Sequence, residues 1–303
     1  MKKQKYNELI SLGNEAFAKG DLRKASEYYE DALQFDSRIS DVLTLGFIYI
    51  DLENYTRAEE LFLAILEVER NARSIYGLGL CYEQKNDKEK AIELFEEALK
   101  IDQNEPVIYF DCAYLHEELN QYDKAIAYYL EAIRLNNDYF WAHLNLGAIY
   151  EKLNEDEKAL HHFICAYKID KDKPMVCYNL GVVYSKLKDP NKALYYYLEE
   201  LEKKDHYQET YYNIGILYKD AFNDLEKAKY YYLLGLKENK DHYLIWYNLG
   251  CVYALSHDYD EAYECFIYLY YKNKDVFDYI KVDPELDKFR STPQYQKIMG
   301  LYP

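Results

Sequence analysis

The chain has 303 residues, of which 50% are hydrophobic and 30% are charged, with 11 glycines and 6 prolines. This composition excludes a disordered, collagen-like or disulfide-stapled chain, because enough apolar surface is present to bury a core. The net charge of −17 repels phosphate backbones and anionic lipid. We therefore expect no nucleic-acid partner and no membrane insertion.

The six cysteines form no CxxC pair, and none has a histidine at zinc-ligand spacing. We expect them to be small buried residues that stay reduced in the cytoplasm. No apolar run suited to a secretory signal follows the basic N-terminus, and no stretch approaches the roughly 18 apolar residues of a membrane span. The sequence therefore predicts a soluble cytoplasmic protein.

Along the chain, a small residue recurs at intervals of 33 to 35 residues, and two further ladders keep step with it. One is made of alanines, and the other of aromatic residues that each follow an alanine by four positions. Three ladders in register indicate internal repetition. The small residues are Gly13, Gly46, Gly79, Ala113, Gly147, Gly181, Gly215 and Gly250; the alanines are Ala25, Ala58, Ala91, Ala125, Ala159, Ala193, Ala228 and Ala262; the rings are Tyr29, Phe62, Phe95, Tyr129, Phe163, Tyr197, Tyr232 and Phe266.

Each unit contains two stretches with apolar residues at helical spacing, which predicts an antiparallel pair of short helices. The small residues mark close helix contacts where a neighbouring ring fills the space of a missing side chain. Pro106 and Pro174 are expected to open first helices. Short polar residues stand where second helices should begin and are typical N-caps, namely Asp21, Asn54, Asp87, Asp189 and Asp258.

With these ladders the chain resembles the tetratricopeptide repeat (TPR) family. The fifth unit fills the family's positions 7, 8, 11, 20, 24 and 27 with Leu146, Gly147, Tyr150, Ala159, Phe163 and Ala166. The resemblance implies an all-α fold, a right-handed superhelical solenoid of antiparallel helix pairs. It also implies that the first helix of each pair lines a concave groove.

Residues 1–5 are expected to lead into eight repeats over residues 6–273, and residues 274–303 to cap the open end. The approximate repeat starts are 6, 39, 72, 106, 140, 174, 208 and 243. Within the cap, Asp283-Pro284 and Thr292-Pro293 are expected to start helices. We expect looser stacking where Glu200 and Gly235 replace the alanine of position 27 and where one extra residue falls near residues 222–224.

No Gly-rich phosphate loop, GxSxG, HExxH or paired Cys/His spacing is present, so the sequence predicts no catalytic residues, cofactor or metal site. His161 and His162 are adjacent and would point about 100° apart on a helix, which disfavours a shared metal.

The groove positions of the family carry the candidate partner-binding residues. Amides at position 6 can donate to and accept from a peptide backbone, and rings at position 5 bring contact area with few rotors to order. Glutamates at position 12 would favour a basic segment of the partner. The candidates are Asn145, Asn179, Asn213, Asn248, Tyr76, Phe110, Tyr114, Trp141, Tyr178, Tyr212, Tyr247, Glu83, Glu117 and Glu151.

Each pattern has an ordinary alternative. Asn is common at position 6, the 38 tyrosines fit a compositional bias, and the glutamates fit a solvated face. We interpret the chain as a non-catalytic scaffold that binds a protein or peptide segment in its groove. The alternative is a structural subunit that self-associates, or is fixed in a larger complex, through tyrosine-rich surfaces. Partner, pathway and oligomeric state do not follow from the fold.

Overall fold

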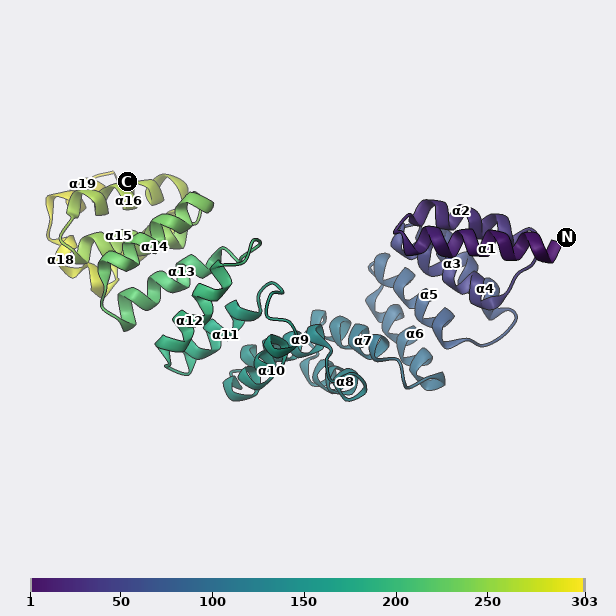
Figure 1. The fold of residues 1–303 in the computed structure, drawn as a ribbon. Coiled ribbons are helices and arrows are strands. Elements are labelled where there is room, and N and C mark those ends of the chain that lie inside the picture. Colours follow the sequence, from purple (N-terminus) through teal and green to yellow (C-terminus); the bar gives the residue numbers. More distant parts are fainter. Residues whose placement is uncertain (1, 302–303) are drawn as a thin grey trace. The chain divides into compact units, whose positions relative to one another are not determined.

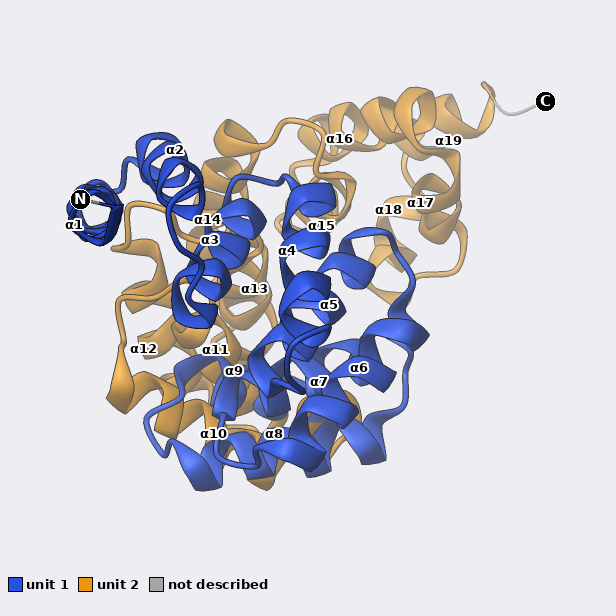
Figure 2. Ribbon diagram, turned by 90° about the vertical axis from the view of Figure 1, so that its right-hand side faces the viewer, with its two compact units in different colours: residues 1–149 blue, residues 150–303 orange. Residues whose placement is uncertain are grey.

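The computed structural model describes residues 2–301, and every regular element in that range is a helix (Figure 1). The all-α prediction is therefore confirmed. The chain divides into two compact units, residues 1–149 and 150–303 (Figure 2). Both consist of helices that pair in chain order, each pair joined by a short turn. None of the helices within residues 2–301 combines the length and apolar character that a bilayer crossing requires.

The first unit contains α1 (Lys2–Ala18), α2 (Leu22–Leu33), α3 (Ile39–Asp51), α4 (Tyr55–Leu66), α5 (Ala72–Gln84), α6 (Lys88–Ile101), α7 (Pro106–Glu118) and α8 (Tyr122–Leu135), and α9 (Phe140–Lys152) includes the division. The second contains α10 (Asp156–Ile169), α11 (Val176–Lys186), α12 (Pro190–Leu201), α13 (Glu209–Ile216), the π-helix η1 (Leu217–Ala221), α14 (Leu225–Glu238), α15 (Tyr243–Leu255) and α16 (Tyr259–Lys272). It ends with α17 (Lys274–Asp278), the 3-10 helices η2 (Tyr279–Lys281) and η3 (Pro284–Leu286), α18 (Asp287–Arg290) and α19 (Pro293–Met299). Residues 2–5, which the sequence places before the first repeat, belong to α1.

The turn inside every helix pair uses one left-handed residue. These residues have φ from 52° to 75°, and the backbone N–H after each bonds back into the first helix, as Asp21 does to Ala16 at 2.9 Å. Only one of the eight is glycine, because the closing hydrogen bonds tolerate asparagine and even larger residues there. They are Gly20, Glu53, Asn86, Asn120, Asn154, Lys188, Asn223 and His257.

Most of the predicted helix starts are confirmed. Asp21, Asn54, Asp87 and Asp189 each accept a hydrogen bond from the backbone N–H three residues on, whereas Asp258 stands at the cap position without a side-chain bond. Pro106 is the first residue of α7. The prediction for Pro174 is wrong, since α11 begins at Val176 after a left-handed Met175.

Close packing between a ring and a bare backbone is confirmed within the repeats. The ring of Tyr29 lies against Gly13, where an added Cβ would stand 2.9 Å from Cδ2, and Phe266 occupies the same place beside Gly250. Both rings are almost fully buried. The glycine of the first helix thus lets a ring of the second helix reach the backbone.

The three positions at which looser stacking was expected each make specific contacts, and the looser stacking itself stays a prediction. The extra residue is absorbed by the π-helix η1 rather than by the loop near residues 222–224. Gly235 packs so closely that an added Cβ would lie 2.6 Å from Ile245 Cδ1. The carboxylate of Glu200 is fully buried and accepts hydrogen bonds from Lys203 Nζ at 2.8 Å and from the Tyr207 N–H at 3.3 Å.

The segment after α16 covers the apolar flank of the last helix pair. Phe277, Ile280, Leu286, Phe289 and Ile298 are all buried in one cluster with side chains of α15 and α16. Both predicted helix starts are confirmed, because the side chains before Pro284 and Pro293 cap η3 and α19. The segment therefore packs on the last helix pair at the place where the family resemblance implies a cap.

We expect Gly181→Ala to destabilise the protein. Ala normally favours a helix over Gly, but here the new Cβ would overlap the buried ring of Tyr197. The overlap should lower the free energy of unfolding by about 1 to 3 kcal/mol in urea unfolding. Gly300→Ala is the control, because its Cβ would meet only ordinary contacts. A Gly181→Ala protein as stable as the parent would refute the tight contact.

We expect Phe289→Ala to lower the unfolding free energy by about 3 to 5 kcal/mol, because it leaves a cavity under the cap. Val282→Ser is the matched control, since Val282 lies in the same segment and is 74% exposed. Light scattering on heating should show earlier aggregation of the Phe289 variant. Equal scattering for both variants would mean that the segment does not protect the array.

Candidate partner-binding face

A hydrogen bond joins position 5 of one first helix to position 6 of the next. Asn213 Nδ2 donates to the Tyr178 hydroxyl at 3.2 Å, and the amide of Asn248 lowers the pKa of Tyr212 from the equivalent position. Burial raises the pKa of both tyrosines, and the amide hydrogen bond opposes that rise. The amide ladder therefore has structural partners in the framework.

Where position 6 is aspartate, the hydrogen bond is reversed. The Tyr76 hydroxyl donates to Asp111 Oδ2 at 2.6 Å, and the Tyr247 hydroxyl donates to Asp283 Oδ2 at 2.5 Å. Asp283 belongs to the cap, which thus supplies the position 6 side chain of a ninth repeat. A charged acceptor makes these bonds stronger than the amide versions.

Of the remaining candidate asparagines, Asn145 also bonds to a tyrosine of the framework. Phe110 has no hydroxyl, and Asn145 instead donates to the Tyr129 hydroxyl at 3.0 Å. Asn248 also donates to the Leu244 carbonyl at 3.0 Å. Asn179 is half-buried, as are the other three. None of the four amides stands fully exposed on the surface.

The position 5 rings pack between two other rings. Phe110 lies 5.0 Å from Tyr139 and 5.6 Å from Tyr129, measured between ring centroids. Tyr178 lies between Tyr197 and Tyr207, Tyr212 between Tyr232 and His242, Tyr247 between Phe266 and Tyr279, and Tyr76 between Phe47 and Phe95. These rings stabilise the stack and offer only part of their surface to a partner.

Two candidates offer more surface than the rest. Tyr114 of α7 is 40% exposed and Trp141 of α9 is 41% exposed. Aromatic residues with this exposure are typical anchors for a protein partner, because truncating them at an interface commonly costs more than 2 kcal/mol. Both lie in the first unit.

The position 12 glutamates differ in their surroundings. Glu117 accepts a hydrogen bond from the Tyr129 hydroxyl at 2.8 Å, and Glu151 forms an ion pair with Lys186. Glu83 is half-buried among carboxylates. Of those three, only Glu83 forms no side-chain hydrogen bond or ion pair with another residue within 2–301, and Lys88 acts on it from farther away.

Glu83 forms an acidic cluster with Asp111 and Glu118. Burial, together with the charges of those two carboxylates, raises the pKa of Glu83 to about 7, against a smaller lowering by Lys88. Burial also raises the pKa of Asp111 to about 6, although its hydrogen bond from Tyr76 opposes this. The sequence analysis did not name Asp111. It could have been found from its position, because it is the acidic residue at position 6 of the repeat that follows Tyr76 and precedes the four repeats with asparagine there.

We expect stability to fall as pH rises through the range in which Glu83 ionises. The unfolded chain loses this proton near 4.5, whereas the folded protein holds it to about 7. Glu83→Gln should therefore raise the unfolding free energy at pH 8 by on the order of 1 kcal/mol and have no such effect below pH 4.5. Urea unfolding at both pH values measures this. An equal gain for the exposed control Glu93→Gln would contradict the burial argument.

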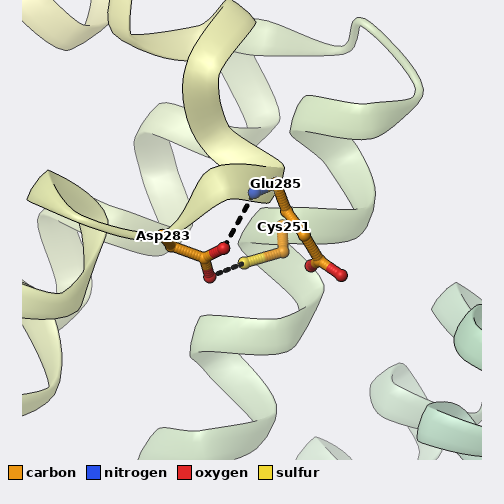
Figure 3. A group of neighbouring side chains, drawn as sticks. All are labelled: Cys251, Asp283 and Glu285. Carbon is orange, nitrogen blue, oxygen red and sulfur yellow. Dashed lines mark hydrogen bonds between the residues drawn. The ribbon is translucent and has the colours of Figure 1, made fainter.

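A second group of candidate ligands lies at the cap. Cys251 on α15, Asp283 before η3 and Glu285 within η3 bring one ligand atom each within 4.8 Å of one another (Figure 3). Lys219 of η1 donates to both Glu285 oxygens at 2.6 and 2.7 Å. Burial raises the pKa of the Cys251 thiol, which disfavours the thiolate that a metal needs. The Lys219 ammonium already provides a positive charge beside Glu285, so this network connects the cap to η1.

The two adjacent histidines also pack as framework side chains. Their rings meet edge to face at 80°, and the buried His162 stacks on Tyr150 with a centroid distance of 5.7 Å. All six cysteines are free, and five of them are buried.

The fold and the candidate partner-binding face define a helical-repeat protein. It is built from antiparallel helix pairs in which an aromatic ring recurs at the same position. Family profiles match along much of the chain: a tetratricopeptide repeat profile over residues 36–104, a second over 9–38, 176–201 and 243–267, and a TPR repeat profile over 118–154. The chain therefore belongs to the tetratricopeptide repeat family. Members of this family generally act as protein-interaction scaffolds and are typically non-catalytic.

Solved structures show the same fold. Pseudomonas aeruginosa PilF is 19% identical with a TM-score of 0.58, over 67% of this chain and 92% of that one. YrrB, described as a TPR protein with an unusual peptide-binding site, is 22% identical with a TM-score of 0.54, over 63% and 98%. A TPR protein from Parabacteroides merdae is 16% identical with a TM-score of 0.54, over 81% and 98%. No curated protein sequence matches this chain significantly.

Proposed function

We propose that this protein is a non-catalytic scaffold that holds a basic protein segment against the first helices of its N-terminal unit. The observation that carries the proposal is the acidic cluster of Glu83, Asp111 and Glu118 beside the exposed ring of Tyr114. The nearby ammonium of Lys88 forms an ion pair with Glu118 at 3.1 Å and partly offsets the charge of Glu83, while Asp111 is hydrogen-bonded to Tyr76. A cationic segment would lower the repulsion that remains.

The aromatic anchors and the acidic cluster would act on different parts of binding. Tyr114 and Trp141 bring apolar area that a partner can bury, which determines most of the affinity. The carboxylates attract a basic segment over a distance and disfavour acidic competitors. Because Glu83 ionises near pH 7 in the folded protein, this attraction is greatest above that pH.

The cytoplasm fits this function, since six free cysteines are stable in a reducing compartment. YrrB, the neighbour described as having an unusual peptide-binding site, adds support for peptide binding by this fold.

The test is capture from native cell extract. The parent and a Tyr114→Ala/Trp141→Ala variant serve as immobilised baits, and crosslinked chains are quantified by mass spectrometry. The variant should lose the specific partner by about tenfold or more, because two exposed anchors are removed. Tyr195→Ala/Tyr271→Ala is the matched control, since these exposed tyrosines lie on the second helices α12 and α16.

The crosslinked segment identifies the chemistry. It should carry a net positive charge, and Glu83→Gln/Glu118→Gln should weaken a synthetic copy of it most at low salt. Two results would contradict the proposal: an acidic captured segment, or equal capture by the parent and by the Tyr114→Ala/Trp141→Ala variant. Melting curves recorded for each bait separate lost binding from lost folding.

A second candidate is a structural subunit that self-associates. Tyr195, Tyr230 and Tyr271 are 59%, 57% and 70% exposed on second helices, although each meets the ring of an adjacent tyrosine edge to face. Sedimentation over a range of concentrations distinguishes this candidate, which requires an oligomer that persists on dilution.

A further inference from the structure

The second unit contains an apolar pocket of about 670 Å³ that is lined mainly by residues of second helices and by none of the position 5 or position 6 residues. We propose that this pocket binds an acidic peptide segment through one of its aromatic or leucine side chains. The proposal is independent of the candidate partner-binding face, because it concerns other residues, the other unit and a partner of opposite charge.

The pocket lies between α14 and α16, and its wall is held in place by hydrogen bonds. Trp246 of α15 stacks on Tyr268 of α16 with a centroid distance of 4.5 Å and an interplanar angle of 29°. The indole N–H of Trp246 donates to the Lys240 carbonyl at 2.8 Å, and the Tyr268 hydroxyl donates to Asp241 at 2.9 Å. The wall is therefore ordered before a ligand arrives, which reduces the entropy lost on binding.

Apolar side chains line the pocket and remain open to solvent. Leu233 and Tyr230 of α14 are 41% and 57% exposed, and Leu234 and Leu236 complete this side. Exposed apolar area that is concave and backed by a fixed aromatic pair suits insertion of a side chain.

The rim carries an excess of positive charge. Lys237, Lys240 and Lys272 line the pocket, and none of them forms an ion pair with any other residue within 2–301. The single acidic lining residue, Asp241, accepts the Tyr268 hydrogen bond. The chain has a net charge of −17, and many of its lysines are paired with carboxylates. The three unpaired ammonium groups therefore make the surface around this pocket locally positive. Carboxylates of a partner complement it.

The openness of the rim favours a peptide over a free small molecule. Small-molecule sites commonly enclose 70 to 90% of their ligand, whereas two of the apolar residues here keep about half of their surface exposed. A peptide needs to bury only one or two side chains, while its backbone and carboxylates stay at the rim near the lysines.

Tryptophan fluorescence tests the proposal directly. The chain has two tryptophans, so in a Trp141→Phe background the emission reports on Trp246 in the pocket alone. The probe is a synthetic peptide of three Glu-Leu-Phe triplets. We expect a saturable change in Trp246 emission with this peptide and none with the matched peptide of Lys-Leu-Phe triplets.

Variants of the rim and of the apolar wall separate the two parts of binding. Lys237→Glu/Lys272→Glu should weaken binding by about tenfold or more, as should Leu233→Ala, which removes apolar contact without changing charge. Lys168→Glu/Lys204→Glu changes the net charge equally at exposed positions outside the pocket, and its affinity should stay within about twofold of the background protein. Melting curves confirm that each variant is folded.

Any of the following results would overturn the proposal. They are unchanged Trp246 emission, an equal change in Trp246 emission with the Lys-Leu-Phe peptide, equal loss in the Lys168/Lys204 control, and saturable binding of dodecanoate without binding of the acidic peptide. The last would assign the pocket to a small apolar anion. Concentration-dependent self-association that is abolished by Lys237→Glu/Lys272→Glu, in the absence of peptide binding, would instead assign it to a second copy of this chain.

Discussion

The contact between a second-helix ring and a first-helix backbone without a side chain determines the geometry of the repeat. Tyr197 lies against Gly181, and Tyr232 lies against Gly215, so closely that neither glycine could carry even a methyl group without movement of the ring. The ring brings the two helices of a pair to a fixed separation, and the left-handed residue between them allows the chain to reverse within that separation. Each pair then presents position 5 to the next pair, where the interrepeat hydrogen bonds and ring contacts form.

The sequence was sufficient to predict this framework because its contacts lie at short, constant spacing. The small residue, alanine and ring recur in register, and a hairpin brings them together without long-range information. The hydroxyl partners of the position 6 residues could not be predicted in the same way, since Tyr178 and Asn213 lie 35 residues apart and meet only when the repeats stack. The candidate site was predicted as a set of groove positions, but its division into framework side chains and exposed ones depends on burial.

Part of the tyrosine excess also has a structural explanation that the family positions did not suggest. Tyr184 and Tyr196 stack at 5.5 Å with an interplanar angle of 3°, and Lys192 Nζ lies 5.0 Å from the centre of the Tyr184 ring. Tyr218, Tyr231 and Lys227 repeat the arrangement in the next helix pair. Such cation–ring–ring contacts contribute to stability at the surface and leave one tyrosine edge exposed. A compositional bias toward tyrosine is therefore not needed for these positions.

The extra residue of repeat seven shows how a local irregularity can serve the end of the array. An insertion inside a helix leaves one residue outside the regular hydrogen-bond ladder, and the π-helix η1 accommodates it. Lys219, which lies within η1, has a side chain only 9% exposed and reaches across to Glu285 in the cap. Removing Glu285 would leave the buried Lys219 ammonium paired only with Asp220 of η1, and the ionic link to the cap would be lost. The irregular turn and the cap thus depend on each other, and an array with a regular repeat seven would lose the ion pair that connects them.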